Sequence, residues 1–417
     1  MAQLSDDCFA FGGELMTVAA ALAEIQARVT PVVGTEEVPF AAAVGRILAR
    51  DIIATMDLPP HANSAVDGYA VAHADLMPDR ETVLPVTGRA AAGHPLGRPA
   101  RRGEAIRIFT GAPMPDGTDT VMMQEDCAIE GQQVRLKPGI RKGANRRHAG
   151  EDIARGETAL AAGLRLRAPE LGLAAALGHS ELSVFTSLRV ALLSTGDEVR
   201  EPGALLPPGA IYDSNRAMLA ALLTGLGCAV TDFGIRPDRE LALTDTLAAA
   251  SRDHDLIVTS GGVSTGEEDH VKAAIERLGT LHFWRLAIKP GRPVALGRVG
   301  GVPLIGLPGN PVAVIVTFVV LARPLILQLA GAAPSSPRLF PVRAGFAYRK
   351  KPGRREYVRA TLRREGDAVV AVKYPHDGAG ILSSIVRSDG LVIVHEASSE
   401  IAVGHIVDFL PFSEVIP

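Results

Sequence analysis

The strongest constraint on the fold is a series of short apolar runs, each of which ends in a loop rich in glycine and proline. Short runs of β-branched and aliphatic residues with such ends are typical of buried strands, and amphipathic stretches separate several of them. We expect strands at 190–193, 229–233 and 256–259, and helices at 215–226, 241–251 and 311–329. This alternation, from residue 188 to about residue 330, predicts a parallel sheet with helices on both faces.

Three of the loops have a composition suited to binding an anion. They span 260–266, 289–293 and 307–311, and each follows an apolar run. Ligands of open α/β sheets bind at the carboxyl ends of the strands, and clustered backbone N–H groups in glycine-rich loops bind phosphate. The first loop matches neither the P-loop nor the dinucleotide-binding fingerprint. The three loops therefore predict one anion-binding pocket that is neither a P-loop nor a dinucleotide-binding site.

Carboxylates follow two of the expected strand ends. Glu267, Glu268 and Asp269 come after the first loop, and Asp197 and Glu198 follow the strand that ends at residue 193. Mg²⁺ prefers oxygen ligands and is commonly held by one or two carboxylates together with substrate phosphates. Solvated turns, or a helix start whose dipole is complemented by acidic residues, explain the same pattern. The residues alone leave both interpretations open.

Cations are concentrated in two places. Lys289 and Arg292 lie in a loop that proline and glycine make rigid, and Arg359 follows a basic stretch at 349–355. A rigid pair of cations can hold an oxyanion or a phosphate with little loss of entropy. A basic surface loop and a solvated hairpin are the alternatives.

The flanking regions predict further domains. Thr17 is expected to cap a helix that ends near residue 29, and helices are also expected at 41–48 and 169–177. Residues 51–152 alternate in short runs broken by glycine and proline, which indicates a β-rich domain inserted between helical segments. Ser214 or Asn215 is the expected N-cap of the helix at 215–226, and Pro324 is expected to kink the long helix. After a linker at 334–337, a small barrel or sandwich is expected from strands at 357–362, 368–372, 391–395 and 405–410.

The composition excludes several classes of protein. The chain has 417 residues, enough for two to four domains, and its net charge of -3 argues against a dedicated nucleic-acid binder. Its three cysteines lack metal-ligand spacing and indicate a reducing compartment without disulfides, and none of the eleven histidines has metal-ligand spacing. The longest apolar run, at 312–322, is short of the ~20 residues that span a membrane. Because acidic residues stand near the start of the chain, we expect a cytoplasmic protein without membrane contact.

Seven motifs in order carry a resemblance to a known family. They lie at 63–70, 108–112, 149–152, 194–198, 260–266 with Asp269, 289–293 and 307–311. From about residue 14 to the C-terminus, the chain resembles the molybdopterin molybdenumtransferases, the molybdenum insertases that are related to the E domain of gephyrin. The resemblance implies an elongated helical segment (14–50 and 158–185), an inserted β-rich domain (51–157), a parallel-sheet α/β molybdopterin-binding domain (186–333) and a C-terminal β barrel (337–417).

The resemblance also implies the reaction and the residues that perform it. Molybdate is inserted into adenylylated molybdopterin with Mg²⁺-dependent release of AMP, in a homodimer whose subunits share the active site, and a molybdopterin adenylyltransferase is a transient partner. The implied catalytic residues are Asp67, Thr110, Asp152, Glu198, Asp269, Lys289 and Arg359. The implied substrate-binding residues are Asp213, Ser260, Gly261, Gly262, Ser264, Arg292, Pro308, Gly309, Asn310 and Ser383.

Within these sets, Glu198 and Asp269 are assigned to Mg²⁺ and phosphate, and Asp67 and Thr110 act across the dimer interface. The oxyanion shell is assigned to Lys289, Arg292, Arg359, Ser264 and Ser383.

Some positions depart from the family pattern, and other functions remain open. Arg285 and Arg292 stand where relatives often carry lysine, Pro237 where some carry an acid, and Ala379 where some carry a hydroxyl. Asp238 is a possible substitute for the missing acid. The alternative functions are an adenylyltransferase and a non-catalytic scaffold like the gephyrin E domain. The sequence does not distinguish molybdate from tungstate.

Overall fold

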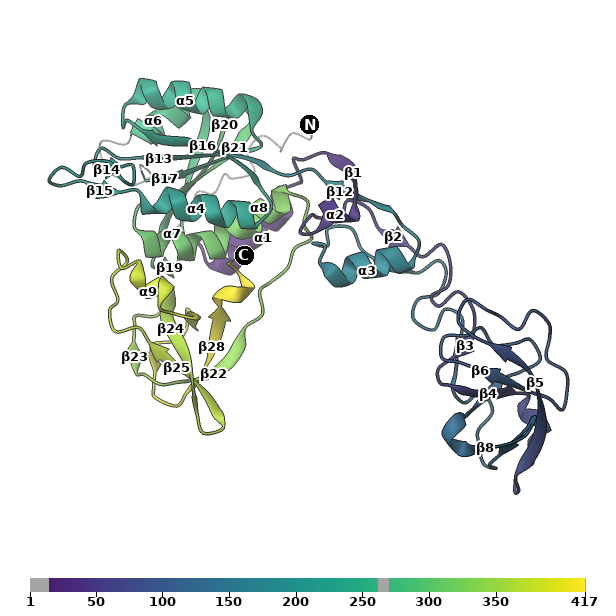
Figure 1. Ribbon diagram of the computed structural model, residues 1–417. Helices are drawn as coiled ribbons and strands as arrows, with labels where there is room; N and C mark the ends of the chain where they lie inside the picture. Colours follow the sequence, from purple (N-terminus) through teal and green to yellow (C-terminus); the bar gives the residue numbers. More distant parts are fainter. Residues whose placement is uncertain (1–14, 262–269, 417) are drawn as a thin grey trace. The chain divides into compact units, whose positions relative to one another are not determined.

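The computed structural model describes residues 15–261 and 270–416, which form two compact units (Figure 1). The first unit contains the residues up to Arg50, the short segment 162–166 and everything from Glu181 onward. The second unit contains 51–161 and 167–180. The chain thus leaves the first unit after Arg50 and returns to it twice, as expected of an inserted domain.

A six-stranded sheet forms the centre of the first unit. Its order is β16 (Ala229–Arg236), β13 (Arg189–Thr195), β17 (Leu256–Ser260), β21 (Val302–Leu307), β20 (Pro293–Val299) and β18 (Gly279–Arg285). The first four strands are parallel, but β20 runs antiparallel to both neighbours. The expected parallel sheet is therefore a mixed one, in which β20 alone runs against the other five strands. The cause is the Gly300-Gly301 pair, whose φ angles of 55° and 89° form a tight hairpin between β20 and β21.

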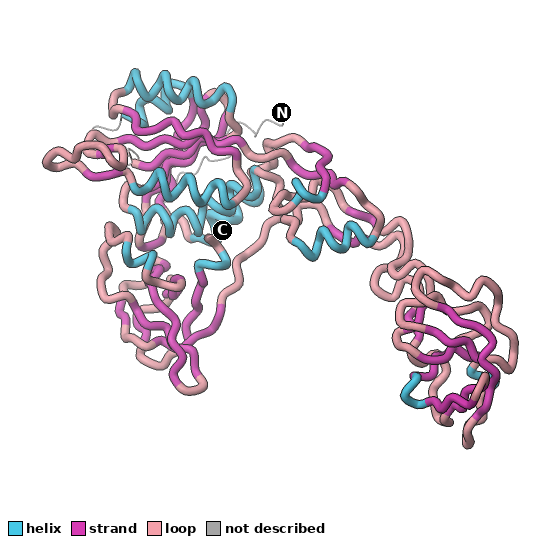
Figure 2. Tube along the Cα trace, in the orientation of Figure 1, coloured by secondary structure: helices cyan, strands magenta, loops and turns pink. Residues whose placement is uncertain are grey.

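Helices cover both faces of this sheet (Figure 2). Leu192 and Val258 face α4 (Ser214–Gly225), α7 (Pro311–Thr317), α8 (Arg323–Leu329) and α1 (Val18–Arg28). Leu193 and Ile257 face α5 (Glu240–Asp253) and α6 (His270–Leu278). Side chains alternate between the two faces along each strand, so one run of apolar residues builds two cores.

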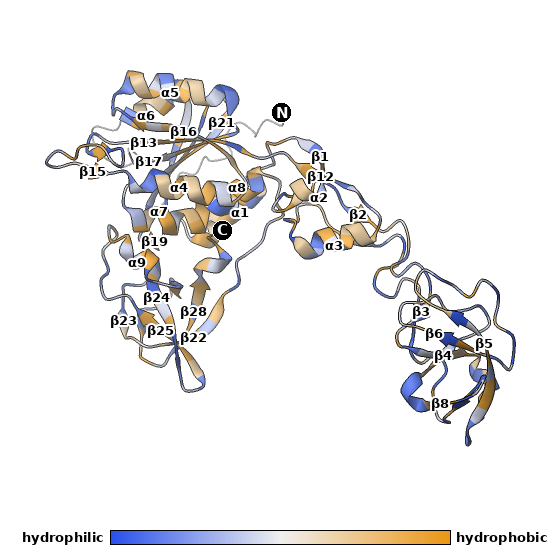
Figure 3. Ribbon diagram, in the orientation of Figure 1, coloured by the Kyte–Doolittle hydropathy of each residue, from blue (hydrophilic) through white to orange (hydrophobic). Residues whose placement is uncertain are grey.

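The long helix expected at 311–329 is interrupted. A π-helical turn, Phe318–Ala322, separates α7 from α8 and ends two residues before Pro324. Proline has no N–H to donate to the preceding turn, so the helix adjusts at this point. The stretch Pro311–Leu329 has a mean hydropathy of 2.3 and is long enough to cross a membrane, but it is largely buried within the first unit. Figure 3 shows its apolar character.

The N-terminal segment is less helical than expected. Thr17 caps α1 through a 3.2 Å bond from the Ala20 N–H, as expected. In contrast, α2 (Phe40–Ala43) is shorter than the predicted helix at 41–48. The expected helical stretch at 158–185 contains α3 (Ala168–Ala176) but also two strands, β11 (Thr158–Leu160) and β12 (Glu181–Phe185). Strand β12 pairs with β1 (Thr35–Pro39).

The second unit is rich in β-structure, as the sequence predicts. Its main sheet has the order β7 (Thr120–Met123), β4 (Gly68–Val71), β6 (Ala105–Ile108), β5 (Thr82–Ala90), β9 (Gln133–Leu136) and β8 (Cys127–Glu130). The short strands β2 (Ile52–Ile53), β3 (Asn63–Ser64) and β10 (Arg146–Arg147) lie outside it. Apolar clusters form on both of its faces. Gly68 is required here, because a Cβ atom would collide with the Met122 carbonyl.

The C-terminal part is a closed barrel rather than a sandwich. Five strands pair in a ring, in the order β24 (Arg355–Glu365), β25 (Ala368–Lys373), β22 (Phe340–Ala344), β28 (Ile406–Pro411) and β26 (Gly390–Val394). The strand β19 (Ile288–Lys289) is added to β24 from outside the ring. Shorter elements are β14 (Val199–Arg200), β15 (Ile211–Tyr212), β23 (Tyr348–Arg349), β27 (Glu400–Ile401) and α9 (Ser383–Val386).

Candidate functional site

A pocket of about 330 Å³ lies at the carboxyl ends of the parallel strands. Ser194 of β13 is in register with Ser260 of β17, which is in register with Leu307 of β21, so the loops after these strands meet at one edge. The N-terminal residues of α4 and α7 form part of the wall, and Gly380 and Leu382 of the barrel segment complete it. This is the position at which open α/β sheets bind ligands.

Unpaired polar atoms line this pocket. The hydroxyls of Ser194 and Thr195 and the side-chain oxygen of Asn215 are buried, and no residue within 15–261 or 270–416 forms a hydrogen bond with them. Such groups are costly to bury unless a ligand or water satisfies them. The sequence marks Ser194 and Thr195 only as hydroxyls at a strand end, and it presents Asn215 as a helix cap. The pocket thus offers polar atoms that await a partner.

Asn215 connects three parts of the pocket. Its Nδ2 donates to the Ser260 hydroxyl at 3.0 Å and to the Gly309 carbonyl at 2.7 Å. The Ser260 hydroxyl in turn donates to the Pro308 carbonyl at 3.4 Å. Five of the predicted substrate-binding residues line the pocket, namely Asp213, Ser260, Gly261, Gly309 and Asn310, and the buried Pro308 directly precedes Gly309. The first and third predicted loops are therefore brought together.

Gly261 is confined by its surroundings. Its φ is +85°, and a Cβ atom there would come within 2.5 Å of the Thr195 carbonyl oxygen. Only glycine fits both the backbone conformation and this close approach. The backbone at Gly261 therefore lies directly against the end of β13.

Of the two residues predicted to bind Mg²⁺, the structure describes one. Glu198 lines the pocket with an exposed carboxylate. The other predicted ligand, Asp269, lies outside the described residues, as do Gly262 and Ser264. Among residues 15–261 and 270–416, no group of three or more acidic, histidine or cysteine side chains could hold a metal. One carboxylate beside unsatisfied oxygens fits a Mg²⁺ ion that takes most of its remaining ligands from substrate phosphates and water.

Asp213 lines the pocket, but its carboxylate is already engaged. One oxygen accepts from the Arg216 N–H at 3.0 Å and the other from Arg216 Nε at 3.1 Å. Asp213, not Ser214 or Asn215, is therefore the N-cap of α4. Arg216 also pairs with Glu201 and Asp232. Because both of its oxygens are bonded within the protein, Asp213 shapes the pocket by fixing the start of α4.

The predicted cations Lys289, Arg292 and Arg359 do not line this pocket. Lys289 Nζ lies 3.2 Å from Glu356 Oε2, and the loop that follows packs on α7, where the Thr317 hydroxyl donates to the Gly291 carbonyl at 3.4 Å. Arg292 is half-buried in this loop. The loop at 289–293 leads into β20, the neighbour of β21 in the sheet, yet neither Lys289 nor Arg292 lines the pocket.

Arg359 lies behind the segment that closes the pocket. It is buried, and it donates to the Ser384 hydroxyl at 3.1 Å and to the carbonyls of His376 at 2.9 Å and Gly378 at 3.3 Å. Burial lowers the pKa of this guanidinium. Ser383 is exposed, with its hydroxyl 3.4 Å from that of Tyr374. The Ala379 carbonyl accepts from the Val312 N–H at 3.0 Å, so the Arg359 segment contacts the start of α7.

The second unit holds the remaining predicted residues. Asp67 Oδ1 accepts two hydrogen bonds from Thr110, one from the N–H and one from the hydroxyl, each 2.8 Å long. These bonds, with the nearby charge of Arg107, lower the pKa of Asp67. Asp152 lies apart, in an open depression of about 570 Å³ that Asn63 and Arg147 also line. The structure therefore brings Asp67 and Thr110 together but assigns Asp152 to a different surface.

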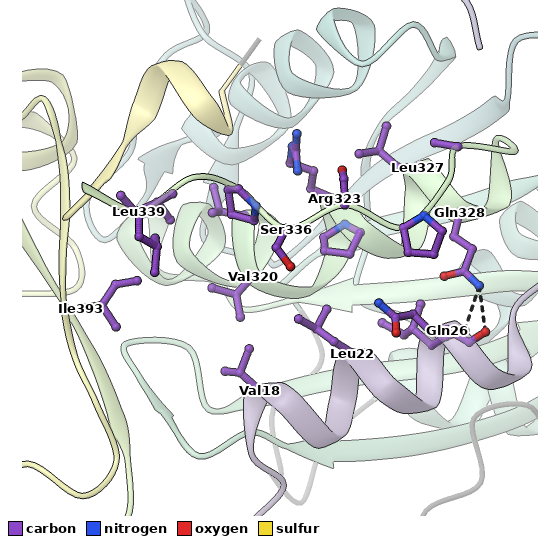
Figure 4. A pocket seen from close by; sticks show the side chains of 18 of the residues that line it. Val18, Leu22, Gln26, Val320, Arg323, Leu327, Gln328, Ser336, Leu339 and Ile393 are labelled. Carbon is purple, nitrogen blue, oxygen red and sulfur yellow. Dashed lines mark hydrogen bonds between the residues drawn. The ribbon is translucent and has the colours of Figure 1, made fainter. Parts of the chain in front are cut away.

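An apolar cavity of about 230 Å³ lies elsewhere in the first unit (Figure 4). Residues of α1, α8, the linker at 332–337 and the barrel line it. Gln328 borders it and donates to the Ile25, Gln26 and Val29 carbonyls at 3.2, 3.3 and 2.6 Å, which caps the end of α1. None of the predicted site residues lines this cavity.

Three family models match successive parts of the chain. The MoeA N-terminal region (domain I and II) matches residues 16–178, a probable molybdopterin binding domain matches 191–328, and the MoeA C-terminal region (domain IV) matches 341–412. Together these models span both units.

Similar proteins match over nearly the full length. A molybdopterin molybdenumtransferase of Haemophilus influenzae is 37% identical over 385 residues, 92% of this chain and 95% of that protein. Molybdopterin molybdenumtransferase 2 of Mycobacterium tuberculosis is 36% identical over 377 residues, 88% of this chain and 92% of that protein. The crystal structure of the molybdopterin biosynthesis MoeA protein of Pyrococcus horikoshii matches with a TM-score of 0.80 and 28% identity, over 95% of this chain and all of that chain. This chain belongs to the MoeA family of molybdopterin molybdenumtransferases, which are transferases of molybdenum cofactor biosynthesis.

Proposed function

We propose that this chain inserts molybdate into adenylylated molybdopterin and releases AMP in a Mg²⁺-dependent step. The observation that carries the proposal is the pocket at the ends of β13, β17 and β21, where the Ser194 and Thr195 hydroxyls are buried without a partner among the residues that the structure describes. A phosphoanhydride bound there would accept hydrogen bonds from these hydroxyls and from backbone N–H groups at the starts of α4 and α7. The pocket then holds the phosphate end of the substrate.

Glu198 is the described residue that would hold Mg²⁺, with Asp269 as the second proposed ligand. When bound, the ion neutralises charge on the phosphate oxygens and on the leaving AMP. Asn215 keeps the loops after β17 and β21 in register through its two bonds, so that the phosphates are held in one orientation.

Molybdate is the second substrate, and we assign it to the cationic group formed by Lys289, Arg292 and Arg359, with Ser383 nearby. Glu356 is buried, and it holds the exposed ammonium of Lys289 at the end of β19. Arg359 is fixed by neutral acceptors, and no carboxylate pairs with it among the described residues, so its charge remains available to an anion. Tetrahedral oxyanions with two negative charges suit such a group, and tungstate fits the same chemistry.

We further propose a homodimer in which the second unit of one subunit completes the pocket of its partner. Asp67 is ionised and held in place by Thr110, yet it does not line the depression that Asp152 lines in the same unit. A fixed carboxylate without a pocket of its own suits a site that another chain supplies. The adenylylated substrate would come from a molybdopterin adenylyltransferase in transient contact. The free thiols Cys127 and Cys228 support a cytoplasmic location.

The direct test supplies purified protein with adenylylated molybdopterin, Mg²⁺ and molybdate. We expect AMP release and formation of active cofactor, and both should stop when EDTA removes Mg²⁺. Absence of AMP from the complete mixture would overturn the proposal. A parallel incubation with ATP and molybdopterin tests the adenylyltransferase alternative, for which pyrophosphate would be the product.

A further inference from the structure

Two arginines lie side by side in the sheet of the second unit. Strands β5 and β6 are parallel neighbours in the sheet of the second unit (Figure 1). Their register places Arg89 next to Arg107. Strand β4 lies on the other side of β6, with Tyr69 opposite Arg107. Three neighbouring strands therefore contribute a tyrosine and two cations to one row.

Aromatic rings hold both guanidinium groups in place. The Cζ atom of Arg107 lies 4.7 Å from the centroid of the Phe109 ring and 5.1 Å from that of Tyr69. The Cζ atom of Arg89 lies 4.7 Å from the same Phe109 centroid. Contacts of this length are cation–π interactions, which orient a guanidinium without neutralising its charge.

No carboxylate pairs with either arginine within the described part of the chain. Arg107 donates to two neutral acceptors, the Gly68 carbonyl at 3.1 Å and Gln124 Oε1 at 2.6 Å. Arg89 is exposed, and Phe109 is its only described partner. Elsewhere in this unit Arg98 pairs with Glu104 and Arg102 with Asp75. Two adjacent like charges repel, and a bound anion would relieve that repulsion.

This cluster borders the Asp67 carboxylate. Phe109 directly precedes Thr110, whose N–H and hydroxyl bind Asp67. Arg107 bonds to the carbonyl of Gly68, the residue after Asp67. An anion bound by the two arginines would therefore lie close to a residue assigned to the reaction.

We propose that Arg89, Arg107 and Phe109 form a phosphate subsite, which binds a phosphate of the adenylylated substrate while the partner subunit holds the remainder. This inference rests on the proposed function. A guanidinium presents paired N–H donors that match two phosphate oxygens, and the Phe109 ring fixes Arg89 in advance of binding. Arg89 contacts the substrate, whereas Arg107 also positions the Asp67 loop through Gly68.

The first test compares Arg89→Gln with wild type in the AMP-release assay, using the full chain. We expect KM for adenylylated molybdopterin to rise about tenfold, because a charge-assisted hydrogen bond is lost, while kcat changes less than about twofold. Arg89→Lys keeps the charge but loses the paired donors, and it should restore part of the affinity. Arg80→Gln is the matched control, since Arg80 is exposed in the same unit and its Nη2 donates to the Met77 sulfur at 3.9 Å.

A second measurement separates this inference from the proposed function. Pyrophosphate is titrated into wild type, Arg89→Gln and Arg80→Gln by calorimetry. If pyrophosphate binds Arg89→Gln more weakly than it binds wild type and Arg80→Gln, the subsite is supported. This holds even if wild type releases no AMP, a result that would overturn only the proposed function. If wild type is active and Arg89→Gln matches it in both KM and pyrophosphate affinity, the subsite is overturned.

Discussion

Asp67 and Thr110 form a preorganised pair in which one carboxylate oxygen accepts both the N–H and the hydroxyl of the same residue at 2.8 Å. Thr110 follows β6, and Asp67 precedes β4, its neighbour in the sheet, so the pairing of these two strands fixes the contact. The same contact holds Asp67 ionised and in one orientation, which suits a residue that acts on a substrate bound elsewhere.

Thr110→Val should remove the hydroxyl bond and keep the N–H bond to Asp67. We expect kcat for AMP release to fall about tenfold, because the carboxylate loses one of its two fixed contacts. Thr110→Ser retains the hydroxyl and should keep most of the activity. Equal kcat values for the valine and serine variants would show that the hydroxyl bond has no role in catalysis.

Gly261→Ala should destabilise the pocket and abolish turnover. Its φ of +85° is unfavourable for alanine, and the added Cβ would lie 2.5 Å from the Thr195 carbonyl. We expect a loss of roughly 1–3 kcal/mol in the free energy of unfolding, with AMP release below a tenth of wild type.

Gly209→Ala is the matched control for that substitution. Gly209 has a similar φ of +84°, but its Cβ would meet nothing within 4 Å. The Gly209→Ala variant should lose about 1 kcal/mol in the free energy of unfolding and keep the wild-type turnover. If both alanine variants behave alike, backbone strain rather than the close approach to β13 explains the effect.

Lys289→Met separates the binding role of the lysine from its structural role. The substitution leaves the buried Glu356 carboxylate with only the Tyr348 hydroxyl, 2.7 Å away, so the free energy of unfolding should fall by roughly 1–3 kcal/mol. KM for molybdate should rise about tenfold as a cation is lost. The double variant Lys289→Met, Glu356→Gln should regain stability without regaining molybdate affinity. Recovery of both properties together would contradict the assignment of Lys289 to the oxyanion.

Glu104 makes the second unit sensitive to acid. A hydrogen bond from Arg98, with further bonds from Thr87 and the Arg101 N–H, lowers the pKa of this buried carboxyl from 4.5 to about 2. A carboxyl with a lowered pKa in the folded state contributes stability above its unfolded pKa and loses it as the pH falls toward the folded value. The melting temperature should therefore drop between about pH 4.5 and pH 2. The Glu104→Gln variant should have a lower melting temperature than wild type at pH 7, and its melting temperature should fall less on acidification. If its melting temperature depends on pH as that of wild type does, Glu104 is not the cause of the acid sensitivity.

The sequence predicted the elements whose signals are local. Thr17 caps α1 as expected, and the apolar runs became β13, β17 and β21, because strand periodicity and N-caps depend on neighbouring residues. The short hairpin at Gly300-Gly301 was missed, and with it the antiparallel direction of β20. One two-residue turn therefore decided the direction of β20 relative to β21.

The site was predicted less completely, because its contacts join distant segments. Asn215 reaches Ser260 and Gly309, which are 45 and 94 positions away in the chain, and nothing at residue 215 indicates those partners. Asp213 resembled a ligand in sequence, but Arg216 engages both of its oxygens. The cation Lys289 was assigned from its loop, whereas its partner Glu356 lies in the barrel.

The shared site is tested most directly by mixing two inactive variants, Asp67→Asn and Glu198→Gln, which change different units of the chain. After subunit exchange, half of the dimers contain one of each variant, and a shared site leaves one of the two pockets in such a dimer with both native carboxylates. We predict that AMP release recovers to about a quarter of the wild-type rate. If the mixture remains as inactive as the separate variants after exchange has been verified, each subunit works alone and the shared-site account is contradicted.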